Sequence, residues 1–293
     1  MLLINSSLVN SFCLISYNSR GFCKLKQDFC RYITSNEVVG SSLPIICNQE
    51  NFLLKSNSYK INNSLPGFHV VSKPAEISSF ERGRPRGGLF IALPNILRSC
   101  VVDVSPSHWR VQAILINFNG SKILLINSYF PVDTKLNNYD DADLVETLQC
   151  IRMLLDNTEH EAVIWAGDIN ADFERNTKHV DITKSFIDER NLNFAWNYYD
   201  IDFTHYHEMN NTSYVSVIDH IIWDSNFKEL VSDCGVIHHP NNLSDHSPVF
   251  CQFRVKFSSE DKASINAKPS LKPSWCQSSE TEKVNYKTKQ IPF

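Results

Sequence analysis

Short apolar runs, many of them rich in β-branched residues, recur along most of the chain and are separated by polar segments. Runs of this length and composition are typical of strands that are buried in a sheet. The predicted strands are residues 12–17, 43–47, 68–72, 88–93, 111–117, 122–129, 162–166, 215–223, 230–237 and 249–257. This number of strands predicts that β-sheets form the centre of the fold.

Three other stretches place their apolar residues at helical spacing. The residues that carry this spacing are Leu25, Phe29 and Ile33, then Leu144, Leu148, Ile151 and Leu155, and then Ile182, Phe186 and Ile187. The second stretch begins with acidic residues 140–143, which favour a helix N-terminus. Because helices and strands alternate only partly, the pattern favours a mixed α/β sandwich over a purely parallel sheet.

The pattern of alternating elements ends near residue 257. Residues 258–293 are polar, rich in Lys and Ser, and almost free of aliphatic side chains. A segment of this composition cannot bury enough apolar surface to fold alone. We therefore expect one folded domain over residues 1–257 and a disordered linker or tail over residues 258–293.

Composition sets limits on the class of protein. Of the 293 residues 42% are hydrophobic, which is enough for a full core, and the formal net charge is −4. That charge is not the basic footprint of most nucleic-acid-binding domains. It excludes nothing, because a site built from carboxylates stays acidic until bound cations are counted.

Cysteines and the N-terminus indicate the compartment. The nine cysteines form no CxxC pair, and Cys13, Cys47, Cys234 and Cys251 lie in apolar runs, so we expect reduced core residues. The N-terminus has no basic region before an apolar one, and its longest apolar stretch, residues 12–15, is far too short for a bilayer. We expect an intracellular protein without a signal peptide or membrane span.

Polar clusters follow several of the predicted strands, at residues 47–50, 165–170, 218–220 and 243–249. Side chains at strand ends are held rigidly, so these clusters predict one shared site. Glu50, Asp168 and Asp245 are the residue types that bind Mg²⁺. Zinc fits poorly, because the chain has no HExxH motif and no paired cysteines. Taken alone, Glu50 is better explained as an exposed surface carboxylate, and the Asp168 segment is equally well explained as a strand that ends in an Asx-type turn.

An Asp–His pair is predicted within this site. His246 follows Asp245 directly, but adjacent side chains on a strand point to opposite faces, so Asp219 on another strand is the better partner. A carboxylate bonded to one imidazole nitrogen favours the charged ring. Asp168 and Asn170 are two positions apart and project to the same side of an extended segment, which suits a general base and a residue that orients water.

Two further features point toward phosphate chemistry. Tyr129 ends a predicted strand and offers a phenolic O–H to an oxyanion, although a core tyrosine is the commoner fate. Arg82, Arg84 and Arg86 make up the one concentrated basic stretch. A flexible basic loop contacts phosphates, but a solvated hairpin loop explains it equally well. The glycines beside these arginines do not form a P-loop, because no Lys-Ser/Thr pair follows them.

Together these motifs resemble the endonuclease/exonuclease/phosphatase family, the Mg²⁺-dependent phosphodiesterases that include DNase I and apurinic endonucleases. The resemblance covers about residues 12–257. The matching motifs, in order, are Asn18 with residues 15–17, Gln49–Glu50, Tyr129 within residues 127–131, Gly167–Asn170, residues 216–220 and residues 244–249. The resemblance implies a four-layer α/β sandwich with two central mixed β-sheets flanked by helices.

The resemblance also implies roles for single residues. Glu50 would hold Mg²⁺, or Mn²⁺ in its place, with help from Asn18 and Asp245. Asp168 would activate the attacking water with Asn170 beside it. His246, oriented by Asp219, would bind the scissile phosphate, and Tyr129 would add a hydrogen bond there. Metal and imidazolium would together neutralise the charge of the phosphorane-like transition state.

Within the family, the chain is most similar to the endonuclease domains of non-LTR retrotransposons, which nick DNA for target-primed reverse transcription. The similar features are the strand after the basic loop, residues 202–206 ahead of the 216–222 segment, and the tail near residues 272–275. This implies DNA as partner, a nuclear location, and a reverse transcriptase downstream in a longer polyprotein. His220 and Ile169 depart mildly from the family pattern.

Two alternatives stay open. The first is a catalytically inactive or domesticated copy of the fold that acts as a binding protein. The second is a phosphatase that acts on a phosphoester outside nucleic acids. The inositol phosphatase branch would show Pro-Ala-Trp-Cys-Asp-Arg near residues 216–220, and this motif is absent.

Overall fold

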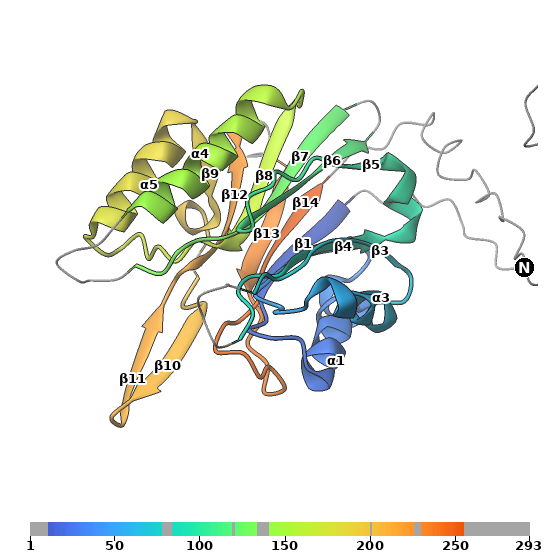
Figure 1. The fold of residues 1–293 in the computed structure, drawn as a ribbon, viewed down its shortest axis with the longest axis horizontal. Helices are drawn as coiled ribbons and strands as arrows, with labels where there is room; N and C mark the ends of the chain where they lie inside the picture. Colours follow the sequence, from blue (N-terminus) through green and yellow to red (C-terminus); the bar gives the residue numbers. More distant parts are fainter. Residues whose placement is uncertain are drawn as a thin grey trace, which may run out of the picture.

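Two six-stranded mixed sheets packed face to face form the centre of the molecule (Figure 1). The computed structural model describes residues 11–77, 84–118, 121–133, 141–199, 201–225 and 230–254. The expected tail at 258–293 lies outside this part of the chain. None of the helices in the described part is long and apolar enough to cross a bilayer.

The first sheet has the strand order β13-β14-β1-β2-β4-β3. Its strands are β1 (Ser11–Asn18), β2 (Leu43–Gln49), β3 (Phe68–Lys73), β4 (Leu89–Pro94), β13 (Val231–Val236) and β14 (Val249–Arg254). Strands β1 and β2 are parallel, whereas β1 and β14 are antiparallel. The N-terminal and C-terminal segments of the domain are therefore neighbours in one sheet.

The second sheet has the order β5-β6-β7-β8-β12-β9. Its strands are β5 (Val101–Asp103), β6 (Val111–Phe118), β7 (Ser121–Tyr129), β8 (Ala162–Asp168), β9 (Leu192–Phe194) and β12 (Asp219–Asp224). Here β7 and β8 are parallel, and β12 runs antiparallel to β8. A separate hairpin, β10 (His205–Met209) with β11 (Thr212–Ser216), belongs to neither large sheet.

Helices cover the outer faces of both sheets (Figure 1). On the first sheet these are α1 (Lys24–Ile33), α2 (Asn36–Val39) and α3 (Tyr59–Ser64), and on the second α4 (Ala142–Asn157) and α5 (Lys178–Glu189). Three short 3₁₀ turns complete the elements: Lys55–Asn57, Asn95–Cys100 and Ala195–Asn197. The layers are helix, sheet, sheet and helix, which confirms the predicted four-layer α/β sandwich.

The core has three apolar layers, and alternation along single strands divides the side chains among them. Phe12 and Leu14 of β1 point between the sheets, whereas Ile15 and Tyr17 point toward α1. Both faces of the central strands are buried, which explains why they appear in the sequence as continuous apolar runs. Trp165 of β8 lies in the third layer, against α5.

The predicted elements match the observed ones with specific differences. Segment 215–223 is two strands, β11 and β12, with a break after Ser216. The hairpin β10–β11 was not predicted, because most of its side chains on both faces are exposed and show no apolar alternation. The brief strands β5 and β9 are also missing from the prediction, since three residues give too little pattern.

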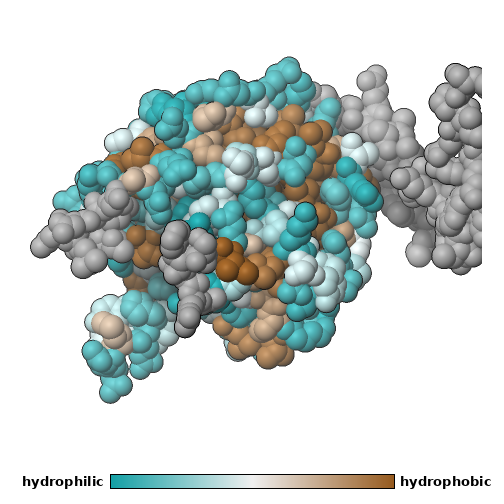
Figure 2. Space-filling model, viewed as in Figure 1, coloured by the Kyte–Doolittle hydropathy of each residue, from teal (hydrophilic) through white to brown (hydrophobic). Residues whose placement is uncertain are grey.

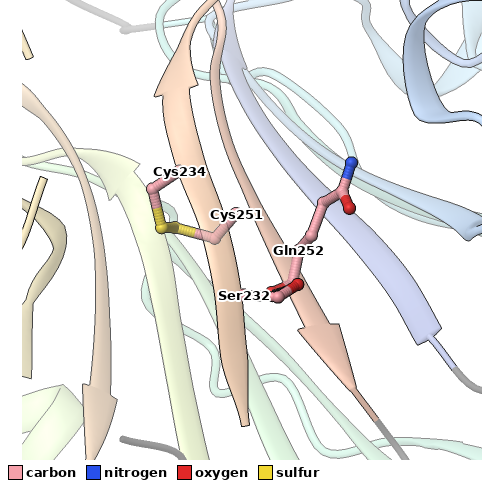
Figure 3. Close-up of a disulfide and its surroundings, with 4 residues drawn as sticks. All are labelled: Ser232, Cys234, Cys251 and Gln252. Atoms are coloured by element: carbon pink, nitrogen blue, oxygen red, sulfur yellow. Dashed lines mark hydrogen bonds between the residues drawn. A yellow bond between two sulfur atoms is a disulfide. The ribbon is translucent and has the colours of Figure 1, made fainter. Parts of the chain in front are cut away.

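The prediction that all cysteines are reduced is wrong for two of them. Cys234 and Cys251 form a disulfide between the neighbouring strands β13 and β14 (Figure 3). The two residues face each other directly in the antiparallel register, and their Cα atoms are 4.2 Å apart. Pairing depends on a register that the sequence does not reveal. Cys13, Cys30 and Cys47 are free and buried, as expected.

Candidate active site

The ends of strands from both sheets meet at one cleft. In the second sheet, Asp168 pairs with Tyr129 on one side and with Asp219 on the other, so three polar side chains stand in a row across β7, β8 and β12. In the first sheet, Asn18 ends β1 and pairs with Gln49. The cleft has a volume of about 370 Å³, and Glu50, Tyr129, Asp168, Asn170 and His246 line it.

Asn18 connects the two sheets. Its amide nitrogen donates to Glu50 Oε2 at 3.0 Å and to Asp168 Oδ2 at 2.8 Å. Its amide oxygen accepts a hydrogen bond from the Arg20 backbone N–H at 3.0 Å. Asn18 is fully buried, so these bonds are not weakened by competing water. The side chain predicted to assist a metal ion therefore presents its N–H groups, not its oxygen, to the two carboxylates.

Glu50 is held in an uncommon backbone conformation. Its φ is 50°, in the left-handed region, which costs energy in a residue other than glycine. Packing of the glycine pair at the end of the basic loop against the following residues stabilises this turn: a Cβ atom on Gly88 would lie 2.5 Å from Asn51 Oδ1. Gly87 and Gly88 thus allow the loop to approach and bond the two residues that follow Glu50.

His246 and Asp219 form the predicted pair. His246 Nδ1 lies 2.8 Å from Asp219 Oδ2, and both side chains are buried. On the other side of the ring, Nε2 lies 4.0 Å from Asp168 Oδ2. Burial lowers the pKa of His246, but the charges of Asp219 and Asp168 outweigh burial and raise the pKa to about 9. The ring is therefore an imidazolium at neutral pH.

Thr204 fixes the position of Asp219 and was missed from the sequence. Its buried hydroxyl oxygen accepts hydrogen bonds from the backbone N–H groups of Ile218 and Asp219 at 3.0 and 3.1 Å. The same residue joins the hairpin to the histidine segment, because its carbonyl accepts from Ser247 N at 2.7 Å. The sequence signal that contains Thr204 is the 202–206 segment, which was noted for its resemblance to retrotransposon endonucleases.

Asp168 is an almost fully buried carboxylate that lines the cleft. Burial and the neighbouring charge of Asp219 raise its pKa to about 7, although His246 and Asn18 act in the opposite direction. Asn170 closes the turn after β8: its backbone N–H donates to Asp168 Oδ1 at 3.1 Å, and its side-chain amide donates to Phe130 O at 2.9 Å. Both residues line the cleft, but the extended segment on which their spacing argument rested ends at Asp168, and Asn170 follows in a turn with a φ of 51°.

Tyr129 remains a protonated phenol. Burial raises its pKa, and the charges of Glu50 and Asp168 raise it further. The guanidinium of Arg110 lies over the faces of both Tyr129 and Trp109, at 5.3 and 4.0 Å from the ring centroids. This stack fixes the tyrosine ring at the edge of the cleft. Tyr129 therefore presents its O–H at the edge of the cleft, where it is hydrogen-bonded to Glu50.

The three arginines of the basic loop differ in position. Arg84 lines the cleft and lies over the ring of Phe52 at 3.9 Å. Arg86 instead packs on Trp109 at 4.8 Å and pairs with Glu76 at 3.5 Å. Arg82 lies outside the described residues. Of the two loop arginines that the structure describes, Arg84 is therefore the one placed to contact a ligand in the cleft.

Asp245 differs from the other carboxylates, because its ion-pair partner is an arginine. One of its oxygens forms an ion pair with Arg20, and the same oxygen lies 3.7 Å from His205 Nε2. The sequence prediction did not include Arg20 and His205, which follow strand β1 and begin the hairpin. Both line the cleft.

His220, the neighbour of Asp219, has a structural role. Its Nε2 lies 2.8 Å from Ala171 O, and its Nδ1 accepts a hydrogen bond from Trp196 Nε1. Burial lowers the pKa of His220 to about 4, so the ring is neutral. These bonds join the strand end of β12 to the turn after β8.

The hairpin β10–β11 extends from the body beside the cleft, with a mostly hydrophilic surface (Figure 2). Its base is fixed to the histidine segment, because Tyr206 N donates to Asp245 O at 2.9 Å. Near the cleft, His207 stacks on Tyr214 with ring centroids 5.1 Å apart. Aromatic and basic side chains of the hairpin thus line one wall of the cleft.

Comparison with solved structures identifies the architecture. The AP endonuclease from Leishmania major is 17% identical over 84% of this chain and 89% of its own length, with a TM-score of 0.62. The endonuclease domain of TRAS1, a telomere-specific non-LTR retrotransposon, is 16% identical over 84% of this chain and 99% of its own, with a TM-score of 0.61. A protein from Leptotrichia buccalis in the endonuclease/exonuclease/phosphatase family has a TM-score of 0.59 at 15% identity, over 84% of this chain and all of its own.

This is the endonuclease/exonuclease/phosphatase fold. The resemblance inferred from the motifs is thereby confirmed for the architecture. Comparison with models of protein families gives no match, and neither does comparison with curated protein sequences. At 15–17% identity only the fold is shared, which leaves activity and site roles to be argued from the geometry.

The residues at the centre of this endonuclease/exonuclease/phosphatase fold fit a divalent cation. Glu50, Asp168 and Asp219 are close together, and His246 is the cation that pairs with two of them. Asp219 Oδ1 is buried without a hydrogen-bond partner. Oxygen donors in excess of positive charge suit a hard ion such as Mg²⁺, whose charge would offset the repulsion among the carboxylates.

Proposed function

We propose that this protein is a Mg²⁺-dependent phosphodiesterase, with Mn²⁺ as a possible substitute, and that it nicks DNA. The observation that carries the proposal is the arrangement around Asp168: Asn18 bonds it to Glu50, and the charged His246 lies on its other side. A potential general base, a potential metal ligand and a cation thus share one cleft. Phosphoryl transfer depends on this combination.

Each side chain has a role that its surroundings support. Glu50 would hold Mg²⁺, which supplies Lewis-acid stabilisation of the phosphate charge when bound. Asp168, whose raised pKa makes it a better base than an exposed carboxylate, accepts the proton of the attacking water. Asn170 orients that water. His246 and Tyr129 donate hydrogen bonds to the phosphate oxygens, and the bond to the leaving oxygen breaks as the new bond to phosphorus forms.

Several features favour DNA as the substrate. Arg84 provides positive charge beside the cleft, and the hairpin provides aromatic faces. The neighbour TRAS1 is named as a retrotransposon endonuclease domain, and another is a 3' phosphatase from Neisseria bound to a DNA hairpin (15% identity, TM-score 0.60). A retrotransposon role would place this protein in the nucleus, with a reverse transcriptase as partner. Both expectations belong to the proposal.

The second candidate is a phosphatase that removes a terminal phosphate, and the Neisseria neighbour favours it. A binding protein without turnover is a weaker candidate. The pairing of His246 with Asp219 and the bridge through Asn18 are buried polar arrangements that a non-catalytic core would not need.

Plasmid nicking separates these candidates. The purified chain should convert supercoiled plasmid to the open circle in Mg²⁺ and not in EDTA, and it should release little phosphate from a 3'-phosphorylated oligonucleotide. Preferential release of terminal phosphate would replace the endonuclease with a phosphatase. No product from either substrate, with DNA still bound, would identify a binding protein.

A further inference from the structure

Arg20 occupies a fixed position at the mouth of the cleft. Its backbone N–H donates to Asn18 Oδ1 at 3.0 Å, and the next N–H, of Gly21, donates to Glu50 O at 2.7 Å. With φ at 45°, Arg20 is in the left-handed region that such a tight turn requires. The turn after β1 is therefore bonded to both Asn18 and Glu50, and it directs Arg20 into the same cleft.

The side chain of Arg20 pairs with Asp245, one of the carboxylates predicted to bind metal. The other nearby basic side chain, His205, lies farther away, with its Nε2 3.7 Å from the same oxygen, and a guanidinium, unlike an imidazole, stays charged at every working pH. Arg20 is therefore the permanent cation at Asp245 among the described residues. The pair is partly exposed, with 49% of the Arg20 side chain accessible, so it adds little to folding.

A metal ion at Asp245 would face competition. Ligand atoms of His205, Asp245 and His246 lie within 4.8 Å of one another, which is close enough for a small ion. However, the Asp245 oxygen already pairs with a guanidinium, and His246 is committed to Asp219. A second ion there would have to displace the Arg20 guanidinium or bind beside it, which Coulomb repulsion between the two cations opposes.

We infer that Arg20 binds a phosphate oxygen of the substrate and that Asp245 positions the Arg20 side chain. In this arrangement the guanidinium takes the place of a second metal ion. The inference rests on the proposed phosphodiesterase function. A guanidinium presents five N–H donors in a rigid fork that matches phosphate. Among the described residues, Asp245 is the one partner of the Arg20 side chain, so other N–H groups of this guanidinium remain for a ligand.

DNA binding in EDTA tests the contact without turnover. A short duplex labelled with a fluorophore is titrated with the wild type, Arg20→Gln, Asp245→Asn and the double variant at several KCl concentrations. Arg98→Gln is the matched control, because this exposed arginine does not line the cleft. We expect Arg20→Gln to weaken binding about 10-fold to 100-fold. The slope of log K against log[salt] should fall by about one.

The double variant tests the positioning role of Asp245. If Asp245 acts through Arg20, Asp245→Asn weakens binding less than Arg20→Gln does, and adding it to Arg20→Gln causes no further loss. Independent losses that add in the double variant would contradict this role. Unchanged binding by Arg20→Gln, with a slope equal to that of Arg98→Gln, would overturn the phosphate contact.

Binding of Mn²⁺, followed by electron paramagnetic resonance, tests the replacement of a metal ion. Asp245→Asn should keep the wild-type Mn²⁺ affinity, whereas Glu50→Gln should lose it. A loss in Asp245→Asn as large as in Glu50→Gln would return Asp245 to the metal site. A wild type that binds DNA through Arg20 and cleaves no phosphodiester would refute the proposed function and leave the Arg20 contact standing.

Discussion

The charge of His246 depends on single neighbours, and one substitution tests this at the residue scale. Asp219 raises the pKa of His246 and bonds to its Nδ1 at 2.8 Å. Because the protonated ring is the active form, Asp219→Asn should lower that pKa from about 9 and shift the alkaline limb of the pH–rate profile toward neutrality.

The profile of kcat/KM between pH 6 and 10 measures this shift, and Asp202→Asn is a control for loss of a carboxylate near another histidine, His238. An alkaline limb that stays in place in Asp219→Asn would contradict the assignment of the charged His246. Asp202 lies outside the cleft, so its substitution should leave the profile unchanged.

Gly167 is required by close packing between strands. A Cβ atom at this position would lie 2.1 Å from the carbonyl oxygen of Ser128 on the parallel neighbour. Gly167→Ala should therefore separate β7 from β8 and lower the free energy of unfolding by about 1–3 kcal/mol. Urea denaturation measures this, with Gly40→Ala as the control, since an added Cβ at Gly40 meets no atom within 4 Å. Equal losses of unfolding free energy in the two variants would show that the backbone conformation of the glycine, not strand packing, causes the destabilisation.

The sequence identified which types of residue form the site, but only one of their pairings. Asp219 as the partner of His246 followed from strand alternation, because neighbours on a strand face opposite sides. The bridge through Asn18 and the pairing of Arg20 with Asp245 did not follow, because both depend on how the two sheets are placed against each other.

Among the elements, the basic loop around Arg84 and Arg86 is the one for which the structure refines the prediction most. Arg84 lines the cleft, whereas Arg86 is engaged with Trp109 and Glu76. Arg84→Ala should weaken binding of duplex DNA and reduce its salt dependence by about one phosphate contact, while Arg86→Ala should change the slope little. Fluorescence anisotropy across a KCl series measures both. A larger loss in Arg86→Ala would mean that the loop rearranges on DNA.

Elements were predicted well where packing leaves a pattern in the sequence. The helix α4 was found from Leu144, Leu148 and Ile151, all of which are buried against the second sheet. The hairpin β10–β11 was not found, because Tyr206 and Tyr214 are exposed and its strands pack on no sheet. The disulfide of Cys234 and Cys251 was missed for a related reason, since it depends on strand register.

At the scale of the whole molecule, a cation should stabilise the native state. The cleft gathers Glu50, Asp168 and Asp219 around one imidazolium, and only the folded chain assembles this group. Mg²⁺ at about 100 times its dissociation constant should add about 2.7 kcal/mol to the free energy of unfolding. Thermal denaturation with and without Mg²⁺ measures the gain. A wild type that gains no more than Glu50→Gln would argue against a specific ion.

The overall charge of −4 gave no sign of the DNA substrate proposed for this protein. The cleft combines acidic groups at its centre with Arg20, Arg84 and Arg175 around it, so charges of opposite sign cancel in the sum. The architecture itself was predictable, because the motifs occur in a fixed order at strand ends. The shape of the cleft was not, since it depends on the hairpin.

The proposed phosphodiesterase site of Glu50 and Asp168 requires a bound cation, and plasmid nicking measures that requirement. Nicking of supercoiled plasmid is followed at increasing Mg²⁺ for the wild type, Glu50→Gln and the surface control Glu37→Gln. We expect the wild type and Glu37→Gln to nick the plasmid with the same Mg²⁺ dependence. Glu50→Gln should be at least about 100-fold slower at every concentration, because a neutral amide keeps the shape and loses the charge that holds the ion. Nicking by Glu50→Gln at the wild-type rate in low Mg²⁺ would show that Glu50 does not hold a catalytic ion.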